Sequence, residues 1–141
     1  MLDSDGKAKL RFDVAVKKSS IDGLGAFAVV SVPARHKIGE FAGERISREE
    51  ARKRASRRHR IAIVEIDHHA AIDGSRRGNK TRFVNHSCNP NTYIRIHHGR
   101  VEFYALRDIA EGEELTCYYG ETHHEGKRPC TCKSTNCRGF L

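Results

Sequence analysis

Residues 82–91 read Arg82-Phe83-Val84-Asn85-His86-Ser87-Cys88-Asn89-Pro90-Asn91. This run is polar and rich in turn-forming residues, yet it lies between two apolar segments. Binding and catalytic residues are often carried by loops at the ends of a sheet, so the run is expected to be a loop that carries a site. A hydrogen-bonded turn is an equally good interpretation of Asn85 and His86 considered alone.

The segments on either side of this run are short, and several alternate apolar with polar residues, which is typical of strands. We expect strands at 10–16, 26–32, 37–42, 61–66, 70–73 and 115–118, and a polar loop at 74–81. The segments 92–96 and 100–106 are expected to form a hairpin around His97-His98-Gly99. The sequence therefore predicts a mainly β (α+β) fold of short strands in small sheets with few helices.

The chain has 141 residues, a formal charge of +8 and five cysteines. This length suits one domain with a modest core. No segment approaches the roughly 18–20 apolar residues of a membrane helix, and the N-terminus has no secretory pattern. We therefore expect an intracellular protein, cytoplasmic in a bacterium or nuclear in a eukaryote, with no membrane partner. In a reducing compartment its cysteines are expected to be free thiols or metal ligands.

Most of the positive charge lies in residues 45–60, which hold eight Lys or Arg residues against two Glu. Ser47 and Glu50 form a capping-box pattern, which predicts a helix over residues 48–57. Its basic side chains are interpreted either as a solvated face or as a contact surface for nucleic acid or an acidic protein.

The C-terminal segment contains three cysteines with the spacing C-x-C-x4-C, at Cys130, Cys132 and Cys137. Three thiolates so close together suit a tetrahedral zinc ion, which needs a fourth ligand. From the residues alone the fourth ligand stays open among Cys88, Cys117, His86, His123 and His124.

Five segments, in order along the chain, resemble the motifs of SET-domain protein-lysine methyltransferases. They are Gly23-Leu24-Gly25-Ala26-Phe27, Glu40-Phe41-Ala42-Gly43-Glu44, Gly78-Asn79 with the run 82–88, Gly112-Glu113-Glu114-Leu115-Thr116-Cys117-Tyr118-Tyr119-Gly120, and the cysteine segment with Arg138-Gly139-Phe140-Leu141. The resemblance implies a SET-domain β-fold at 10–120, a flexible N-terminus at 1–9 and a post-SET zinc-binding segment at 121–141. It also implies a C-terminal pseudoknot that brings the Asn-His pair near Tyr119.

The resemblance implies transfer of a methyl group from S-adenosylmethionine to a lysine of a histone or another nucleic-acid-associated protein. The alternative is a SET-like module that binds a lysine peptide or nucleic acid without catalysis. Small relatives can dimerise, so a homodimer is a further expectation.

The resemblance also assigns roles to individual residues. Tyr119 is the expected catalytic residue, and Phe41, Cys117 and Tyr118 are expected to line the substrate channel. Because Cys117 is small, di- or trimethylation is expected. The expected cofactor-binding residues are Leu24, Gly25, Ala26, Arg82, Asn85, His86 and Leu141, and the expected ligands of one structural zinc ion are Cys88, Cys130, Cys132 and Cys137.

Overall fold

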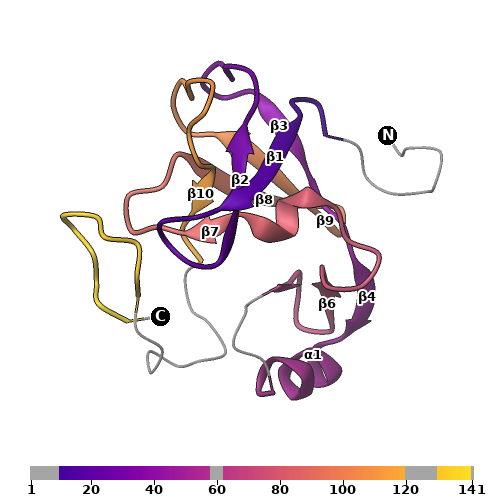
Figure 1. Ribbon diagram of the computed structural model, residues 1–141. Helices are drawn as coiled ribbons and strands as arrows, with labels where there is room; N and C mark the ends of the chain where they lie inside the picture. The colour runs from indigo at the N-terminus through magenta and orange to yellow at the C-terminus, as the bar shows by residue number, and fades with distance from the viewer. Residues whose placement is uncertain (1–9, 58–61, 120–129, 141) are drawn as a thin grey trace.

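The computed structural model of the protein describes residues 10–57, 62–119 and 130–140 (Figure 1). Within these ranges it contains short strands, one α-helix and one 3₁₀-helix. The expected mainly β fold is therefore confirmed. Among the described residues, no helix has the length and apolar character needed to span a bilayer.

The central sheet is antiparallel and has the order β3 (Lys37–Phe41), β9 (Arg100–Ala105) and β8 (Thr92–His97). His97 pairs with Arg100, so His98 and Gly99 alone form the turn between β8 and β9. Both turn residues have positive φ values, 51° and 73°, which is the backbone geometry of a type I′ hairpin turn. The predicted hairpin is confirmed.

A second hairpin, β1 (Val14–Lys18) with β2 (Leu24–Ala28), packs against this sheet. The first strand begins later than predicted, since Leu10 forms only an isolated bridge to Gly39. Apolar residues of the hairpins, including Val14, Ala26, Val101 and Phe103, form the main core.

The third sheet has the order β4 (Glu44–Ser47), β6 (Ala70–Asp73) and β5 (Ile63–Glu65), and α1 (Arg48–Ala55) packs on it. We call these four elements the α1 unit; they lie at the lower end of the molecule in Figure 1. The sequence analysis missed β4, because four residues with two charged side chains show no clear period. Strand β4 becomes a strand by pairing with β6, which lies farther along the chain.

Helix α1 begins as its capping pattern predicts. Ser47 Oγ accepts a hydrogen bond from Glu50 N at 3.1 Å, which satisfies one of the free amides of the first turn. The helix ends at Ala55 rather than at residue 57, and the hydroxyl of Ser56 donates to the carbonyl of Lys53.

The run 82–91 was expected to be a loop, but it contains a short buried strand at Asn85–His86, while residues 87–91 are irregular. After the 3₁₀-helix η1 (Lys80–Phe83), β7 (Asn85–His86) pairs in parallel with β10 (Thr116–Cys117). We call β7, β10 and the residues Asn91 and Thr92, which hydrogen-bond to Thr116 of β10, the junction. Its two strands are two residues long and far apart in sequence, so no local pattern could show them.

Candidate active site and metal centre

Tyr119 is held at the junction by two hydrogen bonds. Its backbone N–H donates to His86 Nδ1 at 3.0 Å, and its hydroxyl donates to the carbonyl of Val84 at 2.8 Å. The parallel pairing of β7 with β10 brings these three residues together from positions more than thirty residues apart. The sequence-based expectation that the Asn-His pair lies near Tyr119 agrees with this geometry.

His86 is buried and neutral. Burial, aided by the nearby charge of Arg138, lowers the pKa of its imidazole to about 4. Because Nδ1 accepts the Tyr119 N–H, the ring proton must lie on Nε2. Nε2 is 3.4 Å from Cys88 Sγ, so the imidazole connects the backbone of Tyr119 to the thiol of Cys88.

Asn85 lies in an acceptor-rich cradle next to β2. Its side-chain nitrogen lies 3.2 Å or less from the carbonyls of Asp22 and Leu24, the Ser19 hydroxyl and the Glu114 carboxylate. Four acceptors therefore surround an amide with two hydrogens. A Cβ at Gly25 would meet Glu114 Oε2 at 2.3 Å, so this side of the cradle requires glycine.

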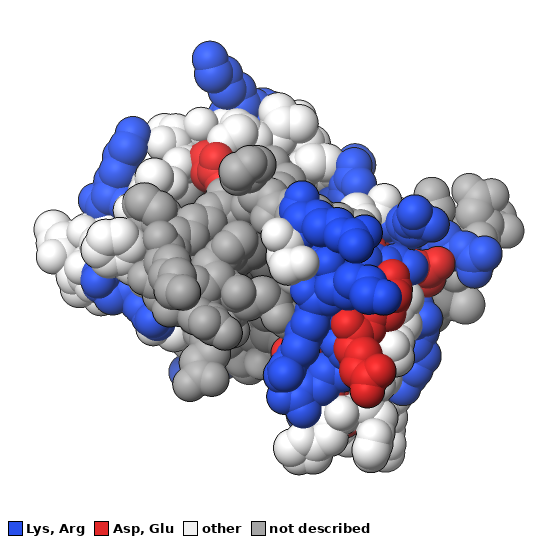
Figure 2. Space-filling model, turned by 90° about the horizontal axis from the view of Figure 1, so that it is seen from below, with Lys and Arg blue, Asp and Glu red and all other residues white. Residues whose placement is uncertain are grey.

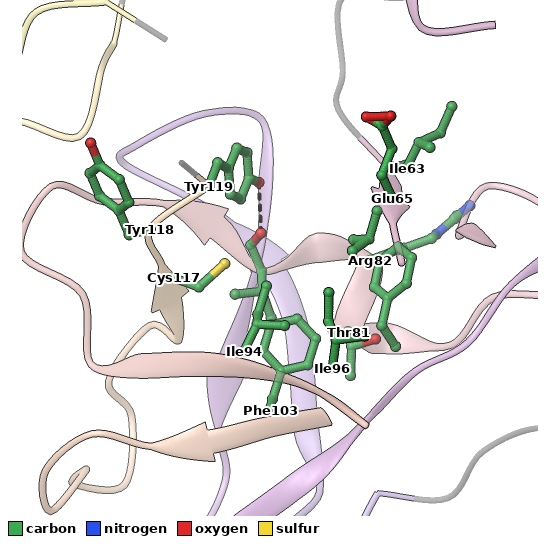
Figure 3. Close-up of a pocket in the computed structure, with 14 residues that line it drawn as sticks. Ile63, Glu65, Thr81, Arg82, Ile94, Ile96, Phe103, Cys117, Tyr118 and Tyr119 are labelled. Atoms are coloured by element: carbon green, nitrogen blue, oxygen red, sulfur yellow. Dashed lines mark hydrogen bonds between the residues drawn. The ribbon is translucent and has the colours of Figure 1, made fainter. Parts of the chain in front are cut away.

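A cavity of about 340 Å³ opens beside Tyr119. Figure 3 shows Tyr119 and Cys117 on one side and Ile63 and Glu65 on the other, with Ile94 and Phe103 near its base. Burial raises the pKa of the Cys117 thiol to about 12, so this thiol is neutral. The lining residues are Phe41, Ala62, Ile63, Val64, Glu65, Thr81, Arg82, Val84, Ile94, Ile96, Phe103, Cys117, Tyr118 and Tyr119.

Four thiols converge where the tail meets the junction. The sulfurs of Cys88, Cys130, Cys132 and Cys137 all lie within 4.8 Å of one another. Backbone N–H groups of Arg138 and Gly139 donate to the sulfurs of Cys88 and Cys137 at 3.3 and 3.4 Å.

The tail also contacts the rest of the molecule through its side chains. Asn136 donates to the Cys88 carbonyl at 3.0 Å, and Thr131 donates to the Ile21 carbonyl at 2.7 Å. Arg138 hydrogen-bonds to the hydroxyl of Tyr118, whose ring lines the cavity. The thiol cluster thus connects β7, the loop before β2 and the cavity wall.

The family model of the SET domain matches residues 23–120, which include the junction, the residues that line the cavity, and Leu24, Asn85 and Glu114 of the cradle. The chain belongs to the SET-domain family. The resemblance of its five motifs is therefore confirmed.

Similar curated proteins contain this SET domain as a small part. The H3 lysine-4 specific histone-lysine N-methyltransferase of Saccharomyces cerevisiae is 37% identical over 94% of this chain, which covers 13% of that protein. The histone-lysine N-methyltransferase trithorax of Drosophila virilis is 37% identical over 91% of the chain, which covers 4% of the relative. The chain thus spans well under a fifth of the length of these relatives.

The cradle fits S-adenosylmethionine, the methyl donor that the SET-domain family implies. This cofactor carries an ammonium group and a sulfonium, and a cluster of carbonyl, hydroxyl and carboxylate oxygens is the environment that such cations require.

The thiol cluster fits zinc. Four sulfurs at about 2.3 Å from one ion are spaced by about 3.8 Å in a tetrahedron, so a small inward movement would complete the geometry.

The structure groups the predicted site residues in three places. The cradle contains Leu24, Gly25 and Asn85, with Ala26 following on β2; the cavity contains Phe41, Arg82, Cys117, Tyr118 and Tyr119; and His86 lies between the cavity and the four cysteines. Leu141, His123 and His124 lie outside the described residues.

Sequence reasoning missed three groups at the site. Glu114 was quoted only as part of a motif, and its place in the cradle depends on tertiary contacts. The Val84 carbonyl that fixes the Tyr119 hydroxyl has no side-chain signal. Glu65 lines the cavity from β5, in a segment that resembles no motif.

Proposed function

We propose that this SET domain is an S-adenosylmethionine-dependent protein-lysine N-methyltransferase acting inside the cell on a histone or another nucleic-acid-associated protein. The observation that supports the proposal is that Tyr119 lines the cavity and is hydrogen-bonded to His86, the neighbour of the cradle residue Asn85 on β7. A lysine side chain and a methyl donor could approach each other there from opposite sides of the junction.

The cavity prepares the lysine for reaction. An ammonium ion has no lone pair, so the substrate must lose a proton to solvent before its nitrogen can accept a methyl group. Removing the side chain from water between Ile94, Phe103 and Cys117 disfavours its charged form and lowers its pKa. The neutral Cys117 thiol adds no charge that would reverse this effect.

Tyr119 is proposed to orient the amine. Its hydroxyl donates to the Val84 carbonyl, which orients the phenol oxygen so that it can accept an N–H of the substrate and direct the nitrogen lone pair. Positioning of this kind supplies much of the acceleration of a group transfer.

The cofactor would be held by Leu24, Gly25, Ala26, Asn85 and His86, with Leu141 as a further expected contact. Arg82 was also expected to contact the cofactor, but it lines the cavity that would take the lysine. S-Adenosylmethionine supplies an activated methyl group that passes to the lysine nitrogen. The carbonyls and carboxylate of the cradle would bind and orient its cationic groups.

One structural zinc ion is proposed on Cys88, Cys130, Cys132 and Cys137. Four thiolates leave no open position, so the ion would hold the tail rather than take part in the reaction. The His86 imidazole would donate its Nε2 proton to the Cys88 sulfur, as ring N–H groups commonly do beside a metal site.

Methyl transfer from labelled cofactor to histones and to a cell lysate tests the proposal. We expect labelled protein with the wild type, and a loss of at least about 100-fold in kcat for Tyr119→Phe. Tyr93→Phe, which removes a hydroxyl outside the cavity lining, is the matched control and should keep full activity. A protein that binds zinc, cofactor and lysine peptide but labels nothing would instead support the non-catalytic module.

The number of methyl groups transferred is proposed to be two or three. Cys117 is smaller than an aromatic residue and leaves room beside Tyr119 for a methylated amine. Mass spectrometry of product at saturating cofactor should show di- or trimethyl-lysine, and Cys117→Tyr should restrict the product to monomethyl-lysine. Only monomethyl product from the wild type would contradict this.

Nucleic acid is proposed as a second partner, and the observation that favours it is the exposed basic face of α1. Lys and Arg side chains gather on the face of the molecule that Figure 2 shows. Of the α1 cations, Arg48, Arg52 and Arg54 pair with carboxylates. Arg52 nevertheless stays exposed, as do Lys53 and the following Arg57.

The α1 face should therefore contact about three phosphates, which gives a slope of about −3 for log affinity against log salt. Lys53→Gln with Arg57→Gln should reduce that slope, and Arg11→Gln should not. Binding that is absent at low salt would exclude this partner. A homodimer stays a prediction that sedimentation can test.

A further inference from the structure

The mouth of the cavity is charged, and its charges come from two sides. Figure 3 places Glu65 and Arg82 on one side of the cavity and Tyr118 on the other. Arg138 reaches this second side from the tail by hydrogen-bonding to the Tyr118 hydroxyl. We call Glu65, Arg82, Tyr118 and Arg138 the rim.

The single carboxylate of the rim is already compensated. Glu65 Oε1 accepts from Arg48 Nε at 2.7 Å and lies 3.4 Å from Arg52 Nη2. Both arginines belong to α1, so the helix holds the carboxylate in an ion pair. Both contacts use Oε1, so a substrate cation that approached Glu65 would also approach the two guanidiniums of α1.

The two other cations of the rim lack such compensation. Arg82 packs over the Phe83 ring at 4.5 Å, and Arg138 lies over the Tyr118 ring at 5.7 Å. Within the described part of the chain, neither guanidinium has a carboxylate in ion-pair range. Among the described residues, Arg82 therefore lines one side of the cavity, and Arg138 lies next to the other side through its bond to the lining residue Tyr118.

We infer that the cavity selects a lysine flanked by acidic residues, with Arg82 and Arg138 as the specificity-determining residues. The inference rests on the proposed function and narrows its substrate class. Carboxylates on both flanks of the lysine would meet unpaired guanidiniums, whereas basic flanks would meet charges of the same sign. Like charges at an interface exclude partners, and opposite charges fix orientation.

The opposite specificity would require Glu65 to read a basic neighbour of the target lysine. The ion pairs to Arg48 and Arg52 oppose this. Glu65→Gln separates the two possibilities. If Glu65 binds a basic neighbour of the lysine, this change should lower the affinity and kcat/KM for peptides with basic flanks. If the carboxylate only balances the arginines of α1, the same change should strengthen the preference for acidic flanks.

The experiment uses three short peptides with one lysine flanked on both sides by Glu, Gln or Arg. Methyl transfer gives kcat/KM, and fluorescence anisotropy of the same labelled peptides gives affinity on the zinc- and cofactor-loaded protein. At low salt we expect the Glu-flanked peptide to exceed the Gln-flanked one about tenfold in both measurements, and the Arg-flanked peptide to be the poorest.

Charge-removing variants assign the effect to the rim. Arg82→Gln and Arg138→Gln should each lower the Glu-to-Gln ratio about threefold, whatever they do to the absolute rate. Arg11→Gln removes the same charge from an exposed position outside the cavity lining and should leave the ratio unchanged. Measured zinc content shows whether Arg138→Gln has disturbed the neighbouring thiols.

The outcomes test the preference for acidic flanks separately from the proposed methyltransferase activity. Equal use of the three peptides, a preference for Arg flanks, or ratios that neither rim variant changes would overturn the inference while transfer itself persists. Binding that ranks the peptides as expected without any transfer would support the inference and overturn the proposed function.

Discussion

The junction and the α1 unit are both held by polar contacts, but by opposite kinds of chemistry. At the junction, Asn91 Oδ1 accepts from Thr116 N and Asn91 Nδ2 donates to the Glu114 carbonyl, both at 2.8 Å, and Thr92 Oγ1 donates to the Thr116 carbonyl at 2.7 Å. These groups are uncharged and join segments more than twenty residues apart.

The α1 unit is held instead by charges. Arg54 bonds Glu44, Glu50 and the fully buried Asp73, and these carboxylates raise the pKa of its guanidinium. The three partners come from β4, α1 and β6. Charged contacts near the surface weaken with salt, whereas buried neutral hydrogen bonds do not. The part that holds Tyr119 should therefore tolerate changes of ionic strength that loosen the part that faces the substrate.

Loss of zinc should have the largest effect and should be confined to the junction. Chelation, or Cys132→Ser, is expected to lower methyl transfer more than 100-fold, because Cys88 and His86 would lose the attachment that positions Tyr119. Hydrogen exchange should accelerate at β7 and β10 while β6 stays protected. Equally accelerated hydrogen exchange at β6, β7 and β10 would show that the two regions unfold as one unit. As a control, adding zinc back after chelation should restore both exchange protection and methyl transfer.

Asp73→Ala should have the second largest effect, a loss of stability in the α1 unit. The buried carboxylate accepts from Arg54 and from both the backbone and hydroxyl of Ser75, and its removal should cost about 3 kcal/mol in the free energy of unfolding. The measurement is denaturant unfolding at low and high salt. Because Asp73 is buried, only the part of the loss that comes from the more exposed Glu44 and Glu50 pairs of Arg54 should shrink in salt. A loss below about 1 kcal/mol would argue against the electrostatic description of this unit.

Asn91→Ala is the matched change at the junction. It leaves a buried amide and a buried carbonyl without partners, which should cost about 2 kcal/mol. Here the loss should be the same at low and high salt. A loss of unfolding free energy that changes with salt would show that the junction, like the α1 unit, depends on charged contacts.

Ser47→Ala should have the smallest effect. It removes the cap of α1 and should cost about 1 kcal/mol by thermal unfolding. Transfer rates with saturating peptide should be unchanged, because Ser47 touches no part of the site. A fall in kcat would indicate that the α1 unit controls the junction directly.

Local patterns predicted the β8–β9 hairpin, the start of α1 and the approximate strands, because alternation and capping act between near neighbours. They did not reveal β4 or β7, since each exists through a partner distant in sequence. The family motifs pointed to Asn85, His86, Tyr119 and the four cysteines. Of the rim, Arg82 and Tyr118 were expected at the site. Glu65 and Arg138 were not, because Glu65 is defined by its contacts with α1 and Arg138 by its contact with Tyr118.

The link from Tyr119 through His86 to Cys88 has a consequence for synthesis on the ribosome. Cys88 meets its thiol partners only after Cys137 has been made, and β7 waits equally for β10. The α1 unit can assemble much earlier, since its strands and helix are complete by Asp73. A nascent chain would thus form its substrate-facing α1 unit before the junction that positions Tyr119. A chain interrupted before Cys137 would lack the complete thiol cluster, and we expect it to be inactive.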